Sequence, residues 1–248
     1  MEYWILKGEI KDPEAYNKAI EKICWLYAIS KELNEMGINL VSTDEKTGIQ
    51  ALEKKILPMI KGNCEKHDNE YIRHGTCCLI ANIDVATGKI ISPSITDSRT
   101  EEDFLKHISE TVKLDEKGKW IFIADNLNTH VSESLVRFVA EQEGIEQDSL
   151  GKKGVRGILK DQKSRKEFLE NTTHKVSFAY TPKHTSWMNQ IEIWFGILVK
   201  KLLKRASFST VDELKNKISE FIQYFNDVMA KPFKWTYKGI PLTSGINE

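Results

Sequence analysis

The amino-acid sequence predicts a mixed α/β fold, and three observations support this prediction. Three strand-like runs follow one another between residues 38 and 95. Strands and helices then alternate, and the chain finishes in helices, an order typical of mixed α/β proteins. With 248 residues, 40% of them hydrophobic, the chain can bury a substantial core in one domain.

The first expected elements are a helix and a strand. Residues 12–36 predict a helix, because Asp12 and Pro13 form a start signal and four apolar residues share one face. Those four are Ile20, Ile23, Cys24 and Tyr27. Gly37 is expected to end the helix, and the strand that follows leads into Asp44.

A hairpin is expected next. Residues 76–85 are apolar and strand-like, residues 86–88 form a turn, and residues 89–95 return as the partner strand. These two strands, with the one before Asp44, give the three strands that precede the alternating part of the chain.

The middle of the chain alternates between helix and strand. A helix over 100–113 begins with Thr100 and then three acids, which suit a helix N-terminus: Glu101, Glu102 and Asp103. A strand over 119–124 and a helix over 132–142 follow, and Ser132 is the expected N-cap.

The last part predicts a long loop, a strand and two helices. Residues 143–174 are the most loop-like, since they combine many charges with Gly144, Gly151, Gly154 and Gly157. Residues 175–180 predict a strand, and residues 187–205 predict a helix. A final helix opens at Ser209, with apolar residues at core spacing: Leu214, Ile218, Phe221, Ile222 and Phe225.

Composition limits the class of protein. No apolar run approaches the roughly 18 residues of a membrane span. The first six residues do not begin a signal peptide, because neither a basic segment nor a long apolar segment follows them. Four cysteines without a regular framework favour reduced thiols in a cytosolic protein: Cys24, Cys64, Cys77 and Cys78. We expect a soluble, cytoplasmic protein with no membrane partner.

Two Cys/His pairs superficially resemble zinc ligands: Cys64 with His67, and His74 with Cys77. Their spacing is unusual, and Cys77 is expected to enter a buried strand. Structural zinc sites prefer ligands on turns and loops. Buried free thiols are therefore the favoured interpretation.

Three acidic residues carry the strongest functional signal. Asp44 follows the apolar residues 38–41, Asp125 closes the apolar run 120–124, and Glu192 lies inside an otherwise apolar helical stripe. Carboxylates at the ends of core strands, with another on a nearby helix, can converge on a hard cation such as Mg²⁺. Two such ions about 3.5–4 Å apart activate the attacking oxygen and stabilise the leaving oxygen of a phosphoryl displacement. The hypothesis is metal-dependent cutting or joining of a nucleic-acid backbone.

Structural roles are the alternative for the two aspartates. Asp44 fits a turn or cap after a strand, the commoner task of a lone aspartate. Asp125 fits an N-cap or an Asx turn before the helix over 132–142. The crevice beyond the carboxyl ends of core strands is, however, where α/β sheets bind ligands.

Glu192 has the strongest physical argument. At about 100° per residue, it points in the same direction as four apolar residues of the predicted helix: Met188, Phe195, Val199 and Leu203. A carboxylate on such a face is costly unless it is neutralised, paired or bound to metal. A buried ion pair, for example with Lys183, is the alternative.

The acids stand in three segments that read STDEKTGIQAL, IADNLNTH and TPKHTSWMNQIEIWFGIL. These segments resemble the catalytic blocks of the DDE-type transposases of bacterial insertion sequences related to the mariner elements, and the resemblance runs from about Val41 to Tyr237. It implies a ribonuclease-H-like mixed sheet flanked by helices, with a C-terminal helical pair. It also implies a metal-binding triad of Asp44, Asp125 and Glu192, two Mg²⁺ ions with Mn²⁺ as substitute, and DNA cleavage followed by strand transfer.

The same resemblance implies partners and a location. The partners are double-stranded DNA, both element ends and target, and a second copy of the chain on that DNA. The location is the cytoplasm of a bacterium, in association with the nucleoid. Asn126, His130 and Asn189 are expected beside the triad, where they would orient its carboxylates or contact DNA.

The charge distribution agrees with a DNA partner, although the net charge of zero does not. Residues 151–205 hold 13 Lys/Arg against 4 Asp/Glu, whereas residues 1–70 hold 10 against 13. A basic segment that leads into the block with Glu192 suits a surface that tracks phosphates, and a solvated loop and helix face is the alternative. The candidate DNA-binding residues are Lys152, Lys153, Arg156, Lys183, His184, Lys200, Lys201, Lys204 and Arg205. Trp187 could meet a flipped base, but core packing is favoured for it.

The chain departs from the family in two places. Complete transposases of this kind carry helix-turn-helix units before the catalytic domain. Residues 1–37 offer one helix and a linker, so we expect the catalytic domain over 38–248. A separately encoded helix-turn-helix half as partner is one interpretation, and a truncated copy of the transposase is the alternative. The 67-residue interval from Asp125 to Glu192 exceeds the compact mariner pattern. The extra length coincides with residues 143–174, interpreted as a basic insertion that grips DNA or a second subunit.

Two other functions stay open. A non-catalytic regulator would dimerise with full-length transposase and block it, although the three intact acids argue against decay. A general ribonuclease-H-like nuclease would cut DNA or RNA without regard to element ends.

Overall fold

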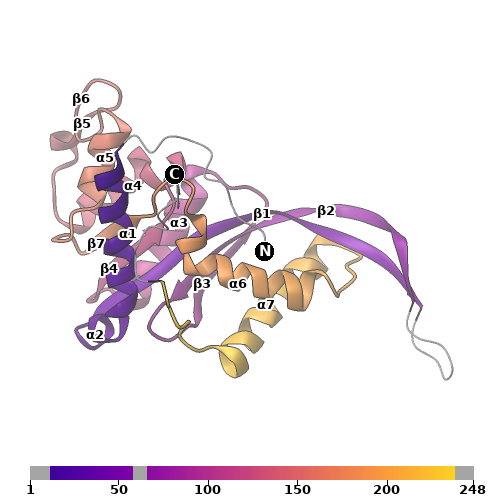
Figure 1. Cartoon of the computed structure of the whole chain (residues 1–248). Helices are drawn as coiled ribbons and strands as arrows, with labels where there is room; N and C mark the ends of the chain where they lie inside the picture. The colour runs from indigo at the N-terminus through magenta and orange to yellow at the C-terminus, as the bar shows by residue number, and fades with distance from the viewer. Residues whose placement is uncertain (1–11, 58–65, 238–248) are drawn as a thin grey trace, which may run out of the picture.

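The computed structural model describes residues 12–57 and 66–237, which build one five-stranded mixed sheet with helices on both faces (Figure 1). The strand order is β3-β2-β1-β4-β7, in which β3, β2 and β1 are antiparallel and β4 and β7 run parallel to β1. Their bounds are β1 Ile38–Leu57, β2 Lys66–Asp84, β3 Ile90–Thr96, β4 Lys119–Ala124 and β7 Val176–Tyr180. The predicted mixed α/β class is confirmed, and the sheet agrees with a ribonuclease-H-like fold.

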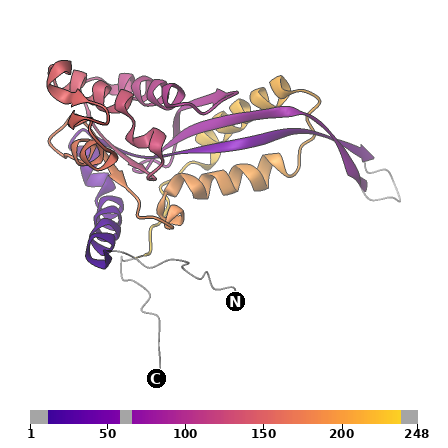
Figure 2. The same cartoon turned by 90° about the horizontal axis from the view of Figure 1, so that it is seen from above.

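Strand alternation divides the core into two layers, because successive side chains point to opposite faces of a sheet. Val41 and Phe122 join the core under α3 (Glu101–Val112) and α4 (Glu133–Gln142). Their neighbours Leu40 and Ile123 join the core under α1 (Pro13–Ala28). Figure 2 shows α3 and α4 on one side of the sheet and α1 on the other.

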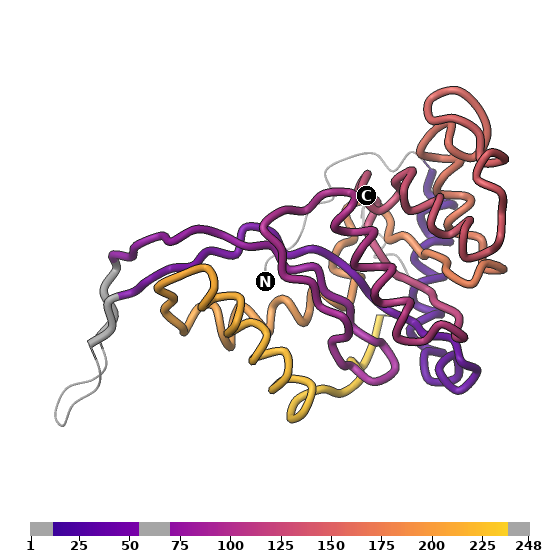
Figure 3. The backbone as a smooth tube through the Cα atoms, turned by 180° about the vertical axis from the view of Figure 1, so that it is seen from behind, coloured from indigo at the N-terminus to yellow at the C-terminus, as the bar shows by residue number. Residues whose placement is uncertain are grey.

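β1 and β2 continue beyond the sheet as a two-stranded arm (Figure 3). The helices α6 (Gln190–Leu198) and α7 (Val211–Tyr224) pack against the base of this arm and share one core, in which the rings of Trp194 and Phe225 lie 6.0 Å apart. The expected C-terminal helical pair is therefore present. Each helix runs into a short π-helical turn, Val199–Leu203 (η5) after α6 and Phe225–Met229 (η6) after α7.

Several helix starts follow the predicted capping. Thr100 and Asp103 form a reciprocal capping box at the start of α3. Ser132 accepts a hydrogen bond from the amide of Leu135 and caps α4. Gly37 has a φ of +74°, so a residue suited to left-handed backbone ends the first helical segment, as predicted. At α7 the cap is Thr210, one residue after the predicted start.

Three predicted elements differ from the structure. The helix expected over 12–36 is two helices, α1 and α2 (Ser30–Glu35), because the chain leaves helical geometry at Ile29. The helix expected over 187–205 starts later, at Gln190, after the 3-10 turn η4 (Ser186–Met188). The strand before Asp44 does not end there but runs on to Leu57, so Asp44 lies inside β1.

The loop expected over 143–174 contains a helix that the sequence did not predict. This helix, α5 (Gln162–Leu169), is capped by Asp161, whose carboxylate accepts a hydrogen bond from the amide of Ser164, and it buries Leu169. A two-stranded hairpin precedes it, β5 (Gly151–Lys152) and β6 (Arg156–Gly157). The remaining short 3-10 turns are η1 Lys113–Asp115, η2 Asn128–Val131 and η3 Gln147–Leu150.

Cys64 of the zinc alternative lies outside the described residues. Cys77 is buried in β2, as predicted, and His74 pairs with Glu53 at 2.7 Å. Cys24, Cys77 and Cys78 are free thiols. In residues 12–57 and 66–237, no helix has the length and apolar character needed to span a bilayer.

Candidate active site

Asp44 and Glu192 meet at the junction of β1 with the first turn of α6. Their carboxyl groups interact electrostatically. Asn189, the residue before α6, donates to the Asp44 Oδ2 at 3.2 Å and to the carbonyl of Thr43 at 2.8 Å. Ser42 donates to the Asn189 Oδ1, so the start of α6 is fixed to β1 by the residues around Asp44.

Glu192 does not point into the helix core, so that prediction is wrong. The buried face of α6 is formed by Ile191, Trp194, Phe195 and Leu198, whereas Glu192 is exposed. Ile191, Trp194, Phe195 and Leu198 follow the i, i+3, i+4, i+7 spacing of one helix face, and Glu192 lies about 100° round the helix from Ile191, at the side of that face. No ion pair joins Glu192 to Lys183 within the described part of the chain. The charge of Lys46 acts on Glu192 instead.

Asp125 follows the end of β4, as predicted. Its Oδ1 accepts the amide of Leu127 at 3.0 Å, which is the expected Asx turn, and lies 2.7 Å from the Nδ1 of His130. Burial would raise the pKa of Asp125, but the hydrogen bond and charge of His130 outweigh it and hold this pKa below its usual value. Asp125 is therefore an anion at neutral pH.

The carboxyl group of Asp44 has a raised pKa. Burial raises its pKa to about 7, and the charges of Asp125 and Glu192 add to the rise, against a hydrogen bond from the amide of Glu45. Although Glu192 as a whole residue is exposed, desolvation of its carboxyl group and the charge of Asp125 also raise the pKa of Glu192. The three acids thus act on one another through charge, although they lie on three different elements.

The donor chemistry fits a hard divalent cation. Carboxylate oxygens are the ligands that Mg²⁺ prefers, and a bound cation would offset the burial and the neighbouring negative charges that raise the pKa of Asp44. As they stand in the described residues, no three His, Cys, Asp or Glu side chains form a complete metal cluster. Asp44 and Glu192 form a close pair, and Asp125 contributes its charge from beside them.

Asn126 ties the loop after Asp125 to neighbouring elements. Its Nδ2 donates to the carbonyl of Thr181, and its Oδ1 accepts from the Nζ of Lys166 on α5 at 2.8 Å. Burial lowers the pKa of Lys166. Asn126 thus supports the loop that carries Asp125, and its amide is fully engaged by protein groups.

The candidate DNA-binding residues are exposed but form no single patch. Lys152, Lys153 and Arg156 lie on the β5–β6 hairpin, at the end of the molecule opposite the arm (Figures 1 and 3). Four others lie in or just after η5 along the arm: Lys200, Lys201, Lys204 and Arg205. Lys183 and His184 lie in the loop that leads to η4, nearest in sequence to Glu192.

Trp187 is 52% exposed, so the favoured core packing is wrong. Its ring stacks at 6.4 Å on Trp235, and Tyr237 meets it edge-on at 5.1 Å. Trp235 in turn contacts Tyr27 of α1, whose hydroxyl donates to the carbonyl of Met188. This aromatic cluster brings the segment after η6 to the loop that precedes Asn189.

Sequence reasoning missed four residues of the site: Ser42, Glu45, Lys46 and Lys166. The first three stand beside Asp44 in the segment STDEK, so their position was visible, but their direction depends on β1 continuing past Asp44. No sequence signal indicated Lys166, which reaches Asn126 from a helix that was not predicted.

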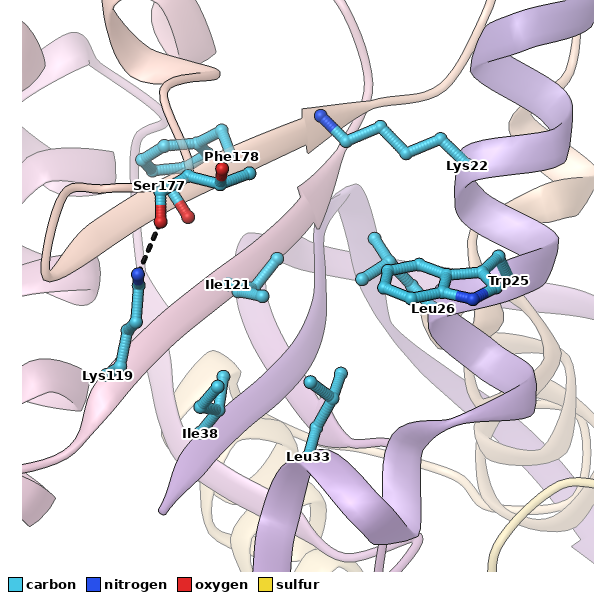
Figure 4. Close-up of a pocket in the computed structure, with 10 residues that line it drawn as sticks. Lys22, Trp25, Leu26, Leu33, Ile38, Lys119, Ile121, Ser177 and Phe178 are labelled. Carbon is cyan, nitrogen blue, oxygen red and sulfur yellow. Dashed lines mark hydrogen bonds between the residues drawn. The ribbon is translucent and has the colours of Figure 1, made fainter. Parts of the chain in front are cut away.

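An apolar pocket of about 260 Å³ lies between α1 and the sheet, lined by Trp25, Leu26 and Ile121 among others (Figure 4). Lys22 and Lys119 flank it. None of the three acids contributes to its lining. The candidate active site lies elsewhere, at the junction of β1, β4 and α6.

Residues 39–215 match the family model of the DDE superfamily endonucleases. No curated protein matches the sequence. The matched range contains Asp44, Asp125 and Glu192.

Solved structures of Mos1 mariner transposase share the fold. A pre-cleavage Mos1 transpososome superposes with a TM-score of 0.54 at 11% identity, over 92% of this chain and 60% of that one. The Mos1 mariner paired end complex with Mn superposes with a TM-score of 0.52 at 12% identity, over 90% of this chain and 58% of that one. The Mos1 strand transfer complex superposes with a TM-score of 0.51 at 14% identity, over 90% of this chain and 57% of that one. The chain therefore has the ribonuclease-H-like fold, and it spans about three fifths of the length of these transposases.

Proposed function

The chain belongs to the DDE superfamily of endonucleases, and on that basis we propose that it is the catalytic domain of a transposase. In this proposal it cleaves DNA at the ends of an insertion sequence and joins the freed ends to target DNA. The observation that carries the proposal is that the carboxyl groups of Asp44, Asp125 and Glu192, from three different elements, act on one another electrostatically. A protein that kept three mutually repelling acids for structure alone would lose stability by it.

Asp44, Asp125 and Glu192 are the proposed ligands of two Mg²⁺ ions, for which Mn²⁺ can substitute. When bound, the ions would activate the attacking oxygen and stabilise the leaving oxygen. The charges of both Asp125 and Glu192 act on the carboxyl group of Asp44, so Asp44 is the proposed ligand shared by the two ions. Asn189 holds the Asp44 Oδ2, and His130 and the amide of Leu127 hold the Asp125 Oδ1, so each aspartate is oriented before the cation arrives.

Double-stranded DNA is the proposed substrate, and the Mos1 paired end and strand transfer complexes support this choice. The exposed loop with Lys183 and His184 leads into η4, next to Asn189 and the acids, so it is proposed to contact the backbone close to the reacting phosphate. The β5–β6 hairpin and η5 lie on either side of that loop and would contact flanking DNA or a second copy of the chain. A helix-turn-helix unit is proposed to act with residues 38–248 for end recognition.

The test is nicking and strand transfer on supercoiled plasmid in Mg²⁺ or Mn²⁺. Wild type is compared with Asp44→Ala, Asp125→Ala and Glu192→Ala, and Mn²⁺ binding is measured for each. We expect wild-type activity that all three substitutions abolish, with weaker Mn²⁺ binding. A wild type that binds no Mn²⁺, or an activity that survives the substitutions, would refute the proposal.

A further inference from the structure

Glu45 is a buried acid that follows Asp44 in β1. Because neighbouring strand residues point to opposite faces, Asp44 faces α6 and Glu45 faces α3 and η2. The Glu45 side chain is 2% exposed, and neither of its carboxylate oxygens has a hydrogen-bond partner among the described residues. An acid buried in this way is costly unless a charge compensates it.

The compensating group is His130. Its Nε2 lies 3.5 Å from the Glu45 Oε1, and its Nδ1 lies 2.7 Å from the Asp125 Oδ1. The imidazole is fully buried and packs on the ring of Phe104 at 4.1 Å. His130 is thus fixed by a ring on its face and by a carboxylate at each nitrogen.

This arrangement acts on one oxygen of Asp125. The Oδ1 receives both the His130 Nδ1 and the amide of Leu127, and within the described residues Oδ2 receives no hydrogen bond. A carboxylate held at one oxygen presents the other in a fixed direction. Groups that orient a ligand in this way contribute roughly 10–100-fold in metal affinity.

We infer that Glu45 is a positioning residue that acts through His130. By occupying the Nε2 side of the ring, it keeps the Nδ1 turned to Asp125 and so keeps the free oxygen of Asp125 turned toward the cation. The inference rests on the proposed role of Asp125 as a metal ligand. Glu101 shows the contrast, because it accepts both the amide and the hydroxyl of Ser134 and needs no histidine.

Mn²⁺ titration of the purified chain tests the inference without cleavage. Glu45→Met removes the contact with His130 but keeps an unbranched side chain, and it should raise the Kd for Mn²⁺ about tenfold. Glu45→Asp keeps the charge but is too short to reach the ring, so it should raise the Kd as well. Glu45→Gln can donate to the Nε2 and should stay close to wild type. A Kd near that of wild type in Glu45→Asp, together with a raised Kd in Glu45→Gln, would mean that only the charge of residue 45 matters. That result would overturn the inference.

His130→Asn supplies a second measurement that does not depend on how Glu45 variants fold. His130→Asn should raise the Kd for Mn²⁺ as Glu45→Met does. The double variant Glu45→Met/His130→Asn should bind Mn²⁺ no more weakly than His130→Asn alone, because the effects of residues that act through one another do not add. Additive losses would show that Glu45 acts independently of His130. Glu101→Gln is the control, which should lower the melting temperature without changing the Kd. If wild type binds no Mn²⁺, the proposed function fails first, whereas a normal Kd in Glu45→Met refutes this inference alone.

Discussion

The Nδ2 of Asn189 donates to the Oδ2 of Asp44 at 3.2 Å, across a separation of 145 residues in sequence. The same Nδ2 also donates to the carbonyl of Thr43, and the hydroxyl of Ser42 donates to the Oδ1 of Asn189. One buried side chain therefore sets both the direction of Asp44 and the place where α6 begins. Since Glu192 lies in the first turn of α6, the distance between two of the three acids depends on Asn189.

Asn189→Ala should weaken Mn²⁺ binding about tenfold, because Asp44 loses the group that orients it. It should also reduce the free energy of unfolding by about 1–3 kcal/mol, since Ser42 loses a buried acceptor. Asn226→Ala is the matched control, because Asn226 also bridges two backbone groups, the amide and carbonyl of Ile90. Titration and thermal melts should show a similar loss of stability in both variants but weaker binding only in Asn189→Ala. Equal Kd values would mean that Asn189 is structural.

Asn126→Ala should reduce cleavage less than Asp125→Ala does. The Asn126 amide is occupied by Thr181 and Lys166, so its loss loosens the loop but removes no ligand. Single-turnover rates and Mn²⁺ affinities of the two variants would be compared. Complete loss of Mn²⁺ binding in Asn126→Ala would contradict the supporting role.

Asp44 predicts a pH dependence of stability for the metal-free protein. Burial and the neighbouring carboxylates raise its pKa from 3.8 to about 7, so between these values the folded state holds a proton that the unfolded state releases. The stabilising contribution is full below about pH 4 and is lost as the pH rises through about 7. Asp44→Asn does not titrate, and its stability relative to wild type should therefore increase from pH 4 to pH 7.

Denaturation in EDTA across this pH range would check the difference between the two proteins. Mg²⁺ added at pH 8 should stabilise wild type and not Asp44→Asn, because binding to the folded state adds to its stability. A constant difference across the range would show that Asp44 has an ordinary pKa.

The sequence predicted the parts of the fold that local signals determine. Strand 119–124 and the caps at Thr100 and Ser132 are as expected, because apolar runs and capping residues act within one turn. The strands of the arm were predicted too short, because the outer residues of the arm are charged and its strand register shifts between Lys46 and Ile49. α5 was missed because it buries little beyond Leu169.

The site shows the same division between local and distant information. Asp44, Asp125 and Glu192 were selected by their segments and stay a prediction, which their mutual influence through charge supports. His130 was expected to orient a carboxylate of the triad, and it contacts Asp125. Its second partner, Glu45, was not predicted, because Glu45 lies on β1 and meets His130 only through the pairing of β1 with β4. The predicted direction of Glu192 was wrong, because the predicted apolar stripe was not the face that α6 buries, which is formed by Ile191, Trp194, Phe195 and Leu198.

Replacing Mg²⁺ with Ca²⁺ should permit DNA binding but block cleavage. Ca²⁺ accepts more oxygen ligands in looser geometry, whereas Mg²⁺ requires near-octahedral coordination. Gel-shift and nicking assays on one plasmid fragment would separate the two steps, with EDTA as the control. Efficient cutting in Ca²⁺ alone would count against the two-ion mechanism.

Gly88→Ala should lower the melting temperature far more than Gly144→Ala. Both glycines have positive φ, +74° and +67°, so both substitutions carry the cost of left-handed backbone, roughly 1–2 kcal/mol. A Cβ on Gly144 meets nothing within 4 Å, whereas one on Gly88 would collide with the backbone carbonyl of Lys231. Backbone cannot rotate away as a side chain can, so the segment after η6 would have to shift.

That shift should reach the site. The segment carries Trp235, which contacts Tyr27 and Trp187 beside the loop that leads to Asn189. In Gly88→Ala, tryptophan fluorescence should therefore change below the melting temperature, and Mn²⁺ affinity should fall slightly with it. Gly144→Ala should leave both unchanged. If the two variants melt alike, the segment after η6 does not pack on the β2–β3 turn, and its link to Asn189 fails with it.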